Sequence, residues 1–312
     1  MDGRGNIGAR PETTVSSSAA YVEPAAVVRD ALAGAKLELV AETYHILKLG
    51  LKISHDEMRT IYTDWNKGEL ADAIVAATAD AIGLCDSDGE PLLDKVLDVP
   101  HGVESCAQAA SLALGQGLPA AIFAQVASAS SLASMKDYRI DASTVMGEAK
   151  LAPTGDRHAM IEEVRKGLLA AVILAHAQAF LLVRDGAGGQ AVGLDIAGVA
   201  RSWGGAEGSG AFIMRLAAQA FERDPELQCI ILDVPVKTLL DHSIPSLRRL
   251  SSRCVEGGLP VPALVAALSF FDLYRSMWLP ANLVSALRDS FTGSGFERVD
   301  RPRGELFHSE WR

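Results

Sequence analysis

The stretch from Gly167 to Val183 (GLLAAVILAHAQAFLLV) contains no Asp, Glu, Lys or Arg. It lies within a longer segment of helical periodicity, residues 158–183, and a helix that is apolar almost all round is buried when it belongs to a soluble protein. No uninterrupted apolar run reaches the roughly 18 residues of a membrane span. The stretch therefore predicts a helix at the centre of a bundle. We read His176 within it as a hydrogen-bonded core residue rather than a ligand or base.

The rest of the chain is also helical in pattern, because from Pro24 onward apolar residues recur at spacings of three and four rather than two. The expected fold class is therefore all-α. The expected helices are 27–51, 56–65, 70–84, 105–114, 119–136, 158–183, 212–221, 225–240, 244–256, 261–278 and 280–291. We expect a flexible arm rich in Gly and Ser over residues 1–23, a helical domain over 24–291, and an irregular tail over 292–312 that packs onto another surface.

Charge and cysteine content narrow the function classes. The chain has 29 Lys and Arg against 39 Asp and Glu, and a net charge of −10 without a basic stripe argues against a nucleic-acid partner. The 4 cysteines form no CxxC pair, so neither a zinc site nor a disulfide framework is expected. The N-terminus lacks a hydrophobic signal region, so we expect a cytoplasmic protein that does not enter a membrane.

Two short motifs resemble ligand sites but have simpler interpretations. Residues 186–191 (GAGGQA) fit a variant of the dinucleotide-binding fingerprint, yet they follow a long helix instead of a strand, so we read them as a helix-ending loop. Residues 86–89 (DSDG) begin like a calcium loop but lack its closing Glu, so we expect an Asx turn. No motif of a hydrolase or a metalloenzyme is present. We therefore expect no bound metal and no cofactor.

A series of longer motifs gives the chain a family resemblance. The motifs are 41–48 (AETYHILK), 64–70 (DWNKGEL), 86–95 (DSDGEPLLDK), 223–228 (RDPELQ), 258–272 (GLPVPALVAALSFFD), 279–283 (LPANL) and 307–311 (FHSEW). In this order and spacing they resemble consecutive motifs of the C-terminal domain of the 6-phosphogluconate dehydrogenase family. The resemblance implies an all-helical domain that forms a homodimer through its long helices. It also implies that the C-terminal tail of each subunit reaches the active site of the other.

The resemblance does not extend to the residues that perform the family's chemistry. In that family a Rossmann domain, which we do not expect here, binds NADP, a Lys takes the substrate's hydroxyl proton, and a Glu protonates the enol left by decarboxylation. The positions that match the Lys and the Glu-Tyr pair hold Ala26, Ala33 and Gly34. The family's His-Asn pair matches Arg29 and Asp30. Neither acid-base group of the family is therefore expected.

If this match were shifted by one residue or more, Lys36 or Glu38 would lie nearer the position of the family's substrate pocket. Residues 103–109 (VESCAQA) match the family's phosphate-contacting segment, and only Ser105 keeps a hydroxyl there. Residues 203–210 (WGGAEGSG) replace bulky side chains with small ones, which predicts a cavity or a kink. Glu207 within them is either a general base of raised pKa or a solvated loop residue.

Two cationic positions of the family persist. Arg165 and Arg288 match the arginines that grip the substrate's phosphate, the second of which comes from the other subunit, and Ser294 matches a His of the tail. Guanidinium groups suit phosphate or carboxylate, so an anionic small-molecule ligand is expected. The alternative for Arg288 is a local pair with neighbouring acids.

The leading hypothesis is a nicotinamide-independent enzyme of specialised metabolism that catalyses proton transfer, isomerisation, cyclisation or elimination. Arg165, Arg288, Arg29 and Ser294 would bind the substrate. Glu207, Asp30 and Ser105 would carry the chemistry. The alternatives are a non-catalytic dimer and the helical half of a two-component dehydrogenase whose Rossmann domain is a separate protein.

Overall fold

The structure is a computed structural model that describes residues 19–100, 104–147, 156–186, 194–205 and 211–311. Within these ranges the chain forms α-helices and no strand, apart from two isolated β-bridges. The expected all-α class is confirmed. The α-helices are α1 (Ala19–His45), α2 (His55–Trp65), α3 (Ala73–Ile82), α4 (Glu104–Gly115), α5 (Ala121–Ser134), α6 (Lys136–Met146), α7 (Arg157–Asp185), α8 (Ile196–Gly204), α9 (Ala211–Arg223), α10 (Val234–Glu256), α11 (Pro262–Tyr274) and α12 (Ala281–Thr292).

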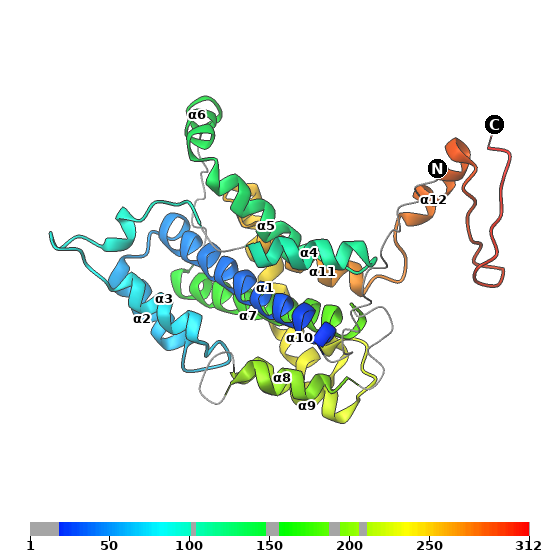
Figure 1. Cartoon of the computed structure of the whole chain (residues 1–312). Coiled ribbons are helices and arrows are strands. Elements are labelled where there is room, and N and C mark those ends of the chain that lie inside the picture. Colours follow the sequence, from blue (N-terminus) through cyan, green and yellow to red (C-terminus); the bar gives the residue numbers. More distant parts are fainter. Residues whose placement is uncertain (1–18, 101–103, 148–155, 187–193, 206–210, 312) are drawn as a thin grey trace, which may run out of the picture. The chain divides into compact units, whose positions relative to one another are not determined.

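Helix α7 is the centre of the bundle, as its apolar sequence predicts. Every residue from Gly167 to Val183 is buried, and α1 and α10 pack against the helix (Figure 1). By length and composition α7 is the one helix of the described residues that is apolar enough to cross a membrane, but 94% of its apolar window is buried inside the protein. The protein itself therefore supplies the apolar surroundings that this helix needs.

Small residues let the central helices approach each other. A Cβ atom on Gly167 would lie 2.9 Å from Leu250 Cδ2 and 3.5 Å from Leu247 Cα of α10. A Cβ there would require the end of the Leu250 side chain to move, so glycine allows the two helices to approach without this adjustment.

Helix α10 differs from the prediction. Two helices, 225–240 and 244–256, were expected, but one α-helix runs through Pro245. A proline inside a helix costs about 3 kcal/mol because it removes one backbone hydrogen bond. A continuous buried face, which includes Leu240, Ile244 and Leu247, offsets this cost. Within the expected helix 225–240, the residues before Val234 form only the 3₁₀ turn Ile230–Leu232. The α-helix starts later because Pro235 favours the first turn of a helix rather than its interior.

Two helices were missed by the sequence pattern. No residue of α6 is buried, so it has no apolar face for periodicity to detect. Helix α8 spans 9 residues that include glycines, but Asp195 starts it by accepting a hydrogen bond from Gly198 N at 2.7 Å. Helix α1 also starts before the expected residue 27, and a π-helical turn, Ile46–Gly50, follows it.

The chain divides into two compact units, Met1–Phe270 and Phe271–Arg312, of which the structure describes the ranges given above. In the second unit, the tail that follows α12 forms an antiparallel bridge between Phe296 and Phe307. Its end is tied to Asp289 of α12, which accepts hydrogen bonds from Trp311 Nε1 and His308 Nδ1, each at 2.7 Å. The tail thus folds back on the helix that precedes it.

Candidate functional site

Ser105 of α4 lies at a close crossing of α4 with Gly34 of α1. A Cβ on Gly34 would lie 2.9 Å from Cys106 Sγ and 4.0 Å from Ser105 Oγ. Cys106 is buried and donates to Ala31 O at 3.4 Å, and burial raises the pKa of its thiol to about 11. Such a thiol is not a nucleophile at neutral pH. The half-buried hydroxyl of Ser105 is therefore the group of this crossing that is open to chemistry.

Arg29 and Asp30 are both exposed on α1 and pair with each other at 3.1 Å. An exposed pair of this kind is solvated and screened, so its geometry does not single out a general base. The structure thus places Asp30 on the protein surface, where its carboxylate is matched by the neighbouring guanidinium.

Arg165 is already engaged by two carboxylates. Its Nε and Nη2 donate to the two oxygens of Glu162, each at 2.8 Å, and its Nη1 donates to Glu69 Oε2 at 2.8 Å. These hydrogen bonds, led by those to Glu162, hold the pKa of the guanidinium above its usual value. An anionic ligand at Arg165 has to compete with both carboxylates.

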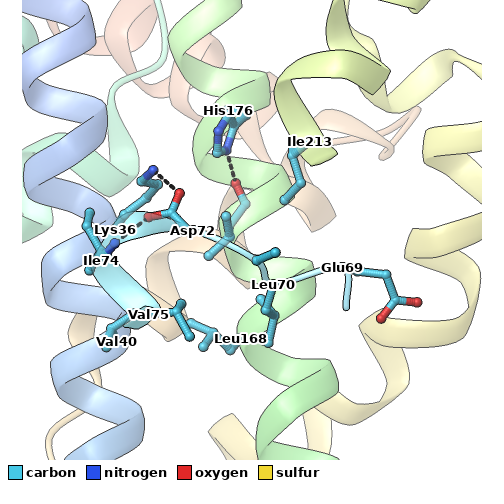
Figure 2. A pocket seen from close by; sticks show the side chains of 12 residues that line it. Lys36, Val40, Glu69, Leu70, Asp72, Ile74, Val75, Leu168, His176 and Ile213 are labelled. Atoms are coloured by element: carbon cyan, nitrogen blue, oxygen red, sulfur yellow. Dashed lines mark hydrogen bonds and ion pairs between the residues drawn. The ribbon is translucent and has the colours of Figure 1, made fainter. Parts of the chain in front are cut away.

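A cavity beside this cluster lies between α1, the start of α3, and α7 (Figure 2). Its polar lining consists of Lys36, Asp72, Glu69 and His176, and Lys36 Nζ donates to Asp72 Oδ2. Asp72 also caps α3, because its Oδ1 accepts from Ile74 N at 2.8 Å. Figure 2 shows the Glu69 carboxylate turned away from this ion pair, in keeping with its bond to Arg165.

His176 is a hydrogen-bonded core residue, as expected. It is 1% exposed, and its Nδ1 lies 2.7 Å from Val172 O. Burial, aided by the positive charge of Lys36, lowers the pKa of His176 to about 4. The imidazole is therefore neutral at physiological pH.

Sequence reasoning missed Asp72 and named Lys36 only as an alternative. The available signal was Lys36 itself, because it follows Leu32 and Ala35 on a face of α1 that is otherwise buried. A lysine there needs an acidic partner. The partner lies 36 residues away and cannot be found by helical spacing.

The two motifs that resemble ligand sites behave as predicted where they are described. Asp88 Oδ1 accepts from Glu90 N at 3.1 Å, which makes the expected Asx turn. Lys95 Nζ pairs with both Asp86 and Asp88. No group of three or more potential metal ligands occurs among the described residues.

The glycine-rich loop does not fit NADP at the point where it begins. Gly186 is the C-cap of α7, and its N–H donates to Leu182 O at 2.8 Å. The C-terminus of a helix carries partial negative charge, which repels a pyrophosphate. Residues 187–193 lie outside the described residues.

For three further predicted site residues, the structure gives no distance to the cavity of the first unit. Glu207 lies outside the described residues. Arg288 and Ser294 are exposed and belong to the second unit, so their predicted role beside Arg165 stays a prediction.

An all-α domain built around one buried helix is the class of protein that this architecture defines. The sequence matches the profile of "6-phosphogluconate dehydrogenase, C-terminal domain" over residues 26–311. The chain therefore belongs to the 6-phosphogluconate dehydrogenase family.

Individual relatives agree with this assignment. The chain is 36% identical over 277 residues to the decarboxylating 6-phosphogluconate dehydrogenase of Rattus norvegicus and 34% identical over 278 residues to that of Haemophilus influenzae. Each alignment covers 88% of this chain but 57% of the relative, so the chain spans less than two thirds of these proteins. A solved structure of Plasmodium falciparum 6-phosphogluconate dehydrogenase shares the fold, with a TM-score of 0.86 and 24% identity, over 92% of this chain and 62% of that one.

Proposed function

We propose that this chain does not perform the family's oxidative decarboxylation but acts on an anionic small molecule without a nicotinamide cofactor. The observation that carries the proposal is the composition of α1 from Ala26 to Gly34. Its only ionisable side chains are Arg29 and Asp30, and these two pair with each other at the surface. A proton transfer of the family's kind needs a Lys and a Glu at this face, and the matching positions are alanines.

The reaction class is proton transfer, isomerisation, cyclisation or elimination, in a cytoplasmic enzyme of specialised metabolism. Ser105 at the α1–α4 crossing, Asp30 and Glu207 are the groups proposed to carry it. Arg165 and Arg288 are proposed to bind the anion, with Arg29 and Ser294 as further contacts. A homodimer is part of the proposal, since α12 exposes Leu283, Val284, Leu287 and Phe291, whose spacing forms an apolar stripe.

The test is NADP⁺ reduction with 6-phosphogluconate, followed at 340 nm, with the rat enzyme as positive control. We expect no NADPH from this chain, even after addition of a Rossmann domain from a relative. NADPH formation by the chain alone contradicts the proposal. Formation only after the Rossmann domain is added identifies the helical half of a two-component dehydrogenase instead.

A second candidate function, a non-catalytic dimer, is supported by the pairing of Arg165 with Glu162 and Glu69. A screen of phosphorylated and carboxylated metabolites by thermal shift separates the two candidates. A ligand whose turnover falls after Ser105→Ala supports the enzyme. A dimer that binds no anion in the screen supports the non-catalytic function.

A further inference from the structure

His176 has one ring nitrogen without a hydrogen-bond partner in the described part of the chain. Its Nδ1 faces the carbonyl of Val172, and a carbonyl can only accept, so Nδ1 carries the proton. Nε2 is therefore a lone-pair acceptor, and it is buried without a partner. Buried polar atoms of native proteins are nearly always satisfied, by protein groups or by an ordered water.

The cavity on which His176 borders offers the complementary group. Lys36 lines it as well, and its ammonium has three N–H bonds. Asp72 Oδ2 is the one acceptor that Lys36 Nζ meets among the described residues. A donor from α1 and an acceptor from α7 thus face the same hollow (Figure 2).

The remaining lining is aliphatic, and it includes Val40, Leu70 and Leu168. The cavity has a volume of about 20 Å³. By the same measure, one water molecule needs about 10 to 15 Å³. The hollow therefore has room for a single hydroxyl-sized group.

We propose that this cavity is a hydroxyl-binding site, in which one O–H group donates to His176 Nε2 and accepts from Lys36 Nζ. The guest is a resident water molecule or the hydroxyl of a small alcohol. A ketone lacks the donor that Nε2 requires, and an apolar guest leaves both polar atoms unsatisfied. This site is independent of the function proposed above.

The test uses the full chain labelled with ¹⁵N-histidine. We expect a water-to-protein nuclear Overhauser effect at the His176 ring and an Nε2 chemical shift typical of a hydrogen-bonded acceptor. Methanol is then added, with acetone as the guest that lacks a donor. A shift of the His176 signals with methanol but not with acetone identifies an alcohol guest, whereas an unchanged water signal identifies resident water.

Lys36→Met combined with Asp72→Asn removes the donor without a change in net charge, and Asn keeps a cap for α3. We expect loss of the water signal in this double variant. The control is Lys237→Met combined with Asp241→Asn, which removes an exposed pair of α10 and should leave the signal unchanged.

Three outcomes overturn the proposal. They are the absence of a water signal at His176 together with the Nε2 chemical shift of an unbonded nitrogen, a shift of the His176 signals that acetone and methanol cause equally, and a water signal that survives in the Lys36 and Asp72 variant. If that variant does not fold, a crystal structure of the unmodified protein decides the matter. It must show density within hydrogen-bonding distance, about 2.7–3.2 Å, of both His176 Nε2 and Lys36 Nζ.

Discussion

Gly34 of α1 lies so close to Cys106 of α4 that a Cβ atom on the glycine would be 2.9 Å from the cysteine Sγ. The missing side chain of Gly34 and the thiol of Cys106 are thus two parts of one packing arrangement. The pair fixes how closely α1 and α4 approach at the face that carries Ser105.

Gly34→Ala should lower the free energy of unfolding by about 1 kcal/mol, because the clash outweighs the better helix propensity of alanine. In a Cys106→Ala background the same change should instead be stabilising, by about 0.5–1 kcal/mol. Urea denaturation of the four proteins in this cycle measures the coupling. Gly115→Ala is the control, since nothing lies within 4 Å of its added methyl group. Equal effects in both backgrounds would show that the two residues do not interact.

The contribution of His176 to the stability of the protein should fall as the pH drops from 6.5 towards 4. The pKa of His176 is lowered from 6.5 to about 4 by burial, so in this window the unfolded chain binds a proton that the folded chain does not. The loss should reach about 3 kcal/mol near pH 4, because each pKa unit corresponds to about 1.4 kcal/mol. His176→Gln, which cannot titrate, should lose less stability over the same range by that amount. Parallel pH profiles of the two proteins in urea denaturation would refute this assignment.

Arg165 should bind anions more tightly after its carboxylate partners are neutralised. Glu69→Gln combined with Glu162→Gln leaves the guanidinium without charged partners among those seen in the structure. We expect this variant to bind inorganic phosphate about tenfold more tightly than the unmodified chain, as charge-assisted hydrogen bonds form. Isothermal titration calorimetry measures the change, and adding Arg165→Ala should abolish it. A gain that persists without Arg165 would locate the phosphate elsewhere.

The tail should detach from α12 when Asp289 is replaced. Asp289 accepts hydrogen bonds from Trp311, His308 and the backbone N–H groups of Gly295 and Ser309, and these donors hold the pKa of its carboxyl below the usual range. Asp289→Ala should therefore speed hydrogen exchange and proteolysis at residues 296–311. Asp300→Ala removes a carboxylate that only pairs locally with Arg298 and should have little effect. Unchanged protection in Asp289→Ala would mean that the packing of Phe296 on Trp311, whose ring centroids lie 5.5 Å apart, suffices to hold the tail.

Sequence reasoning worked where burial follows from one segment alone. Helix α7 is apolar on all sides, so its central position needed no knowledge of its neighbours. The continuity of α10 could not be predicted, because the contacts that offset Pro245 come from α7, far away in sequence. The bond between Arg165 and Glu162 follows from their spacing of three residues, but its bond to Glu69 joins residues 96 positions apart. Pairings of the second kind decide which charges of the candidate site are available.

In the loop of residues 86–95, a lysine of the chain supplies the positive charge that a bound metal ion supplies in a calcium loop. Lys95 contributes its ammonium to both Asp86 and Asp88. The positive charge beside these carboxylates is therefore covalently attached, and it does not depend on the concentration of an ion in solution. Chelators and calcium salts should therefore leave the loop unchanged. Its order is set by the protein's own sequence rather than by the ionic composition of its surroundings.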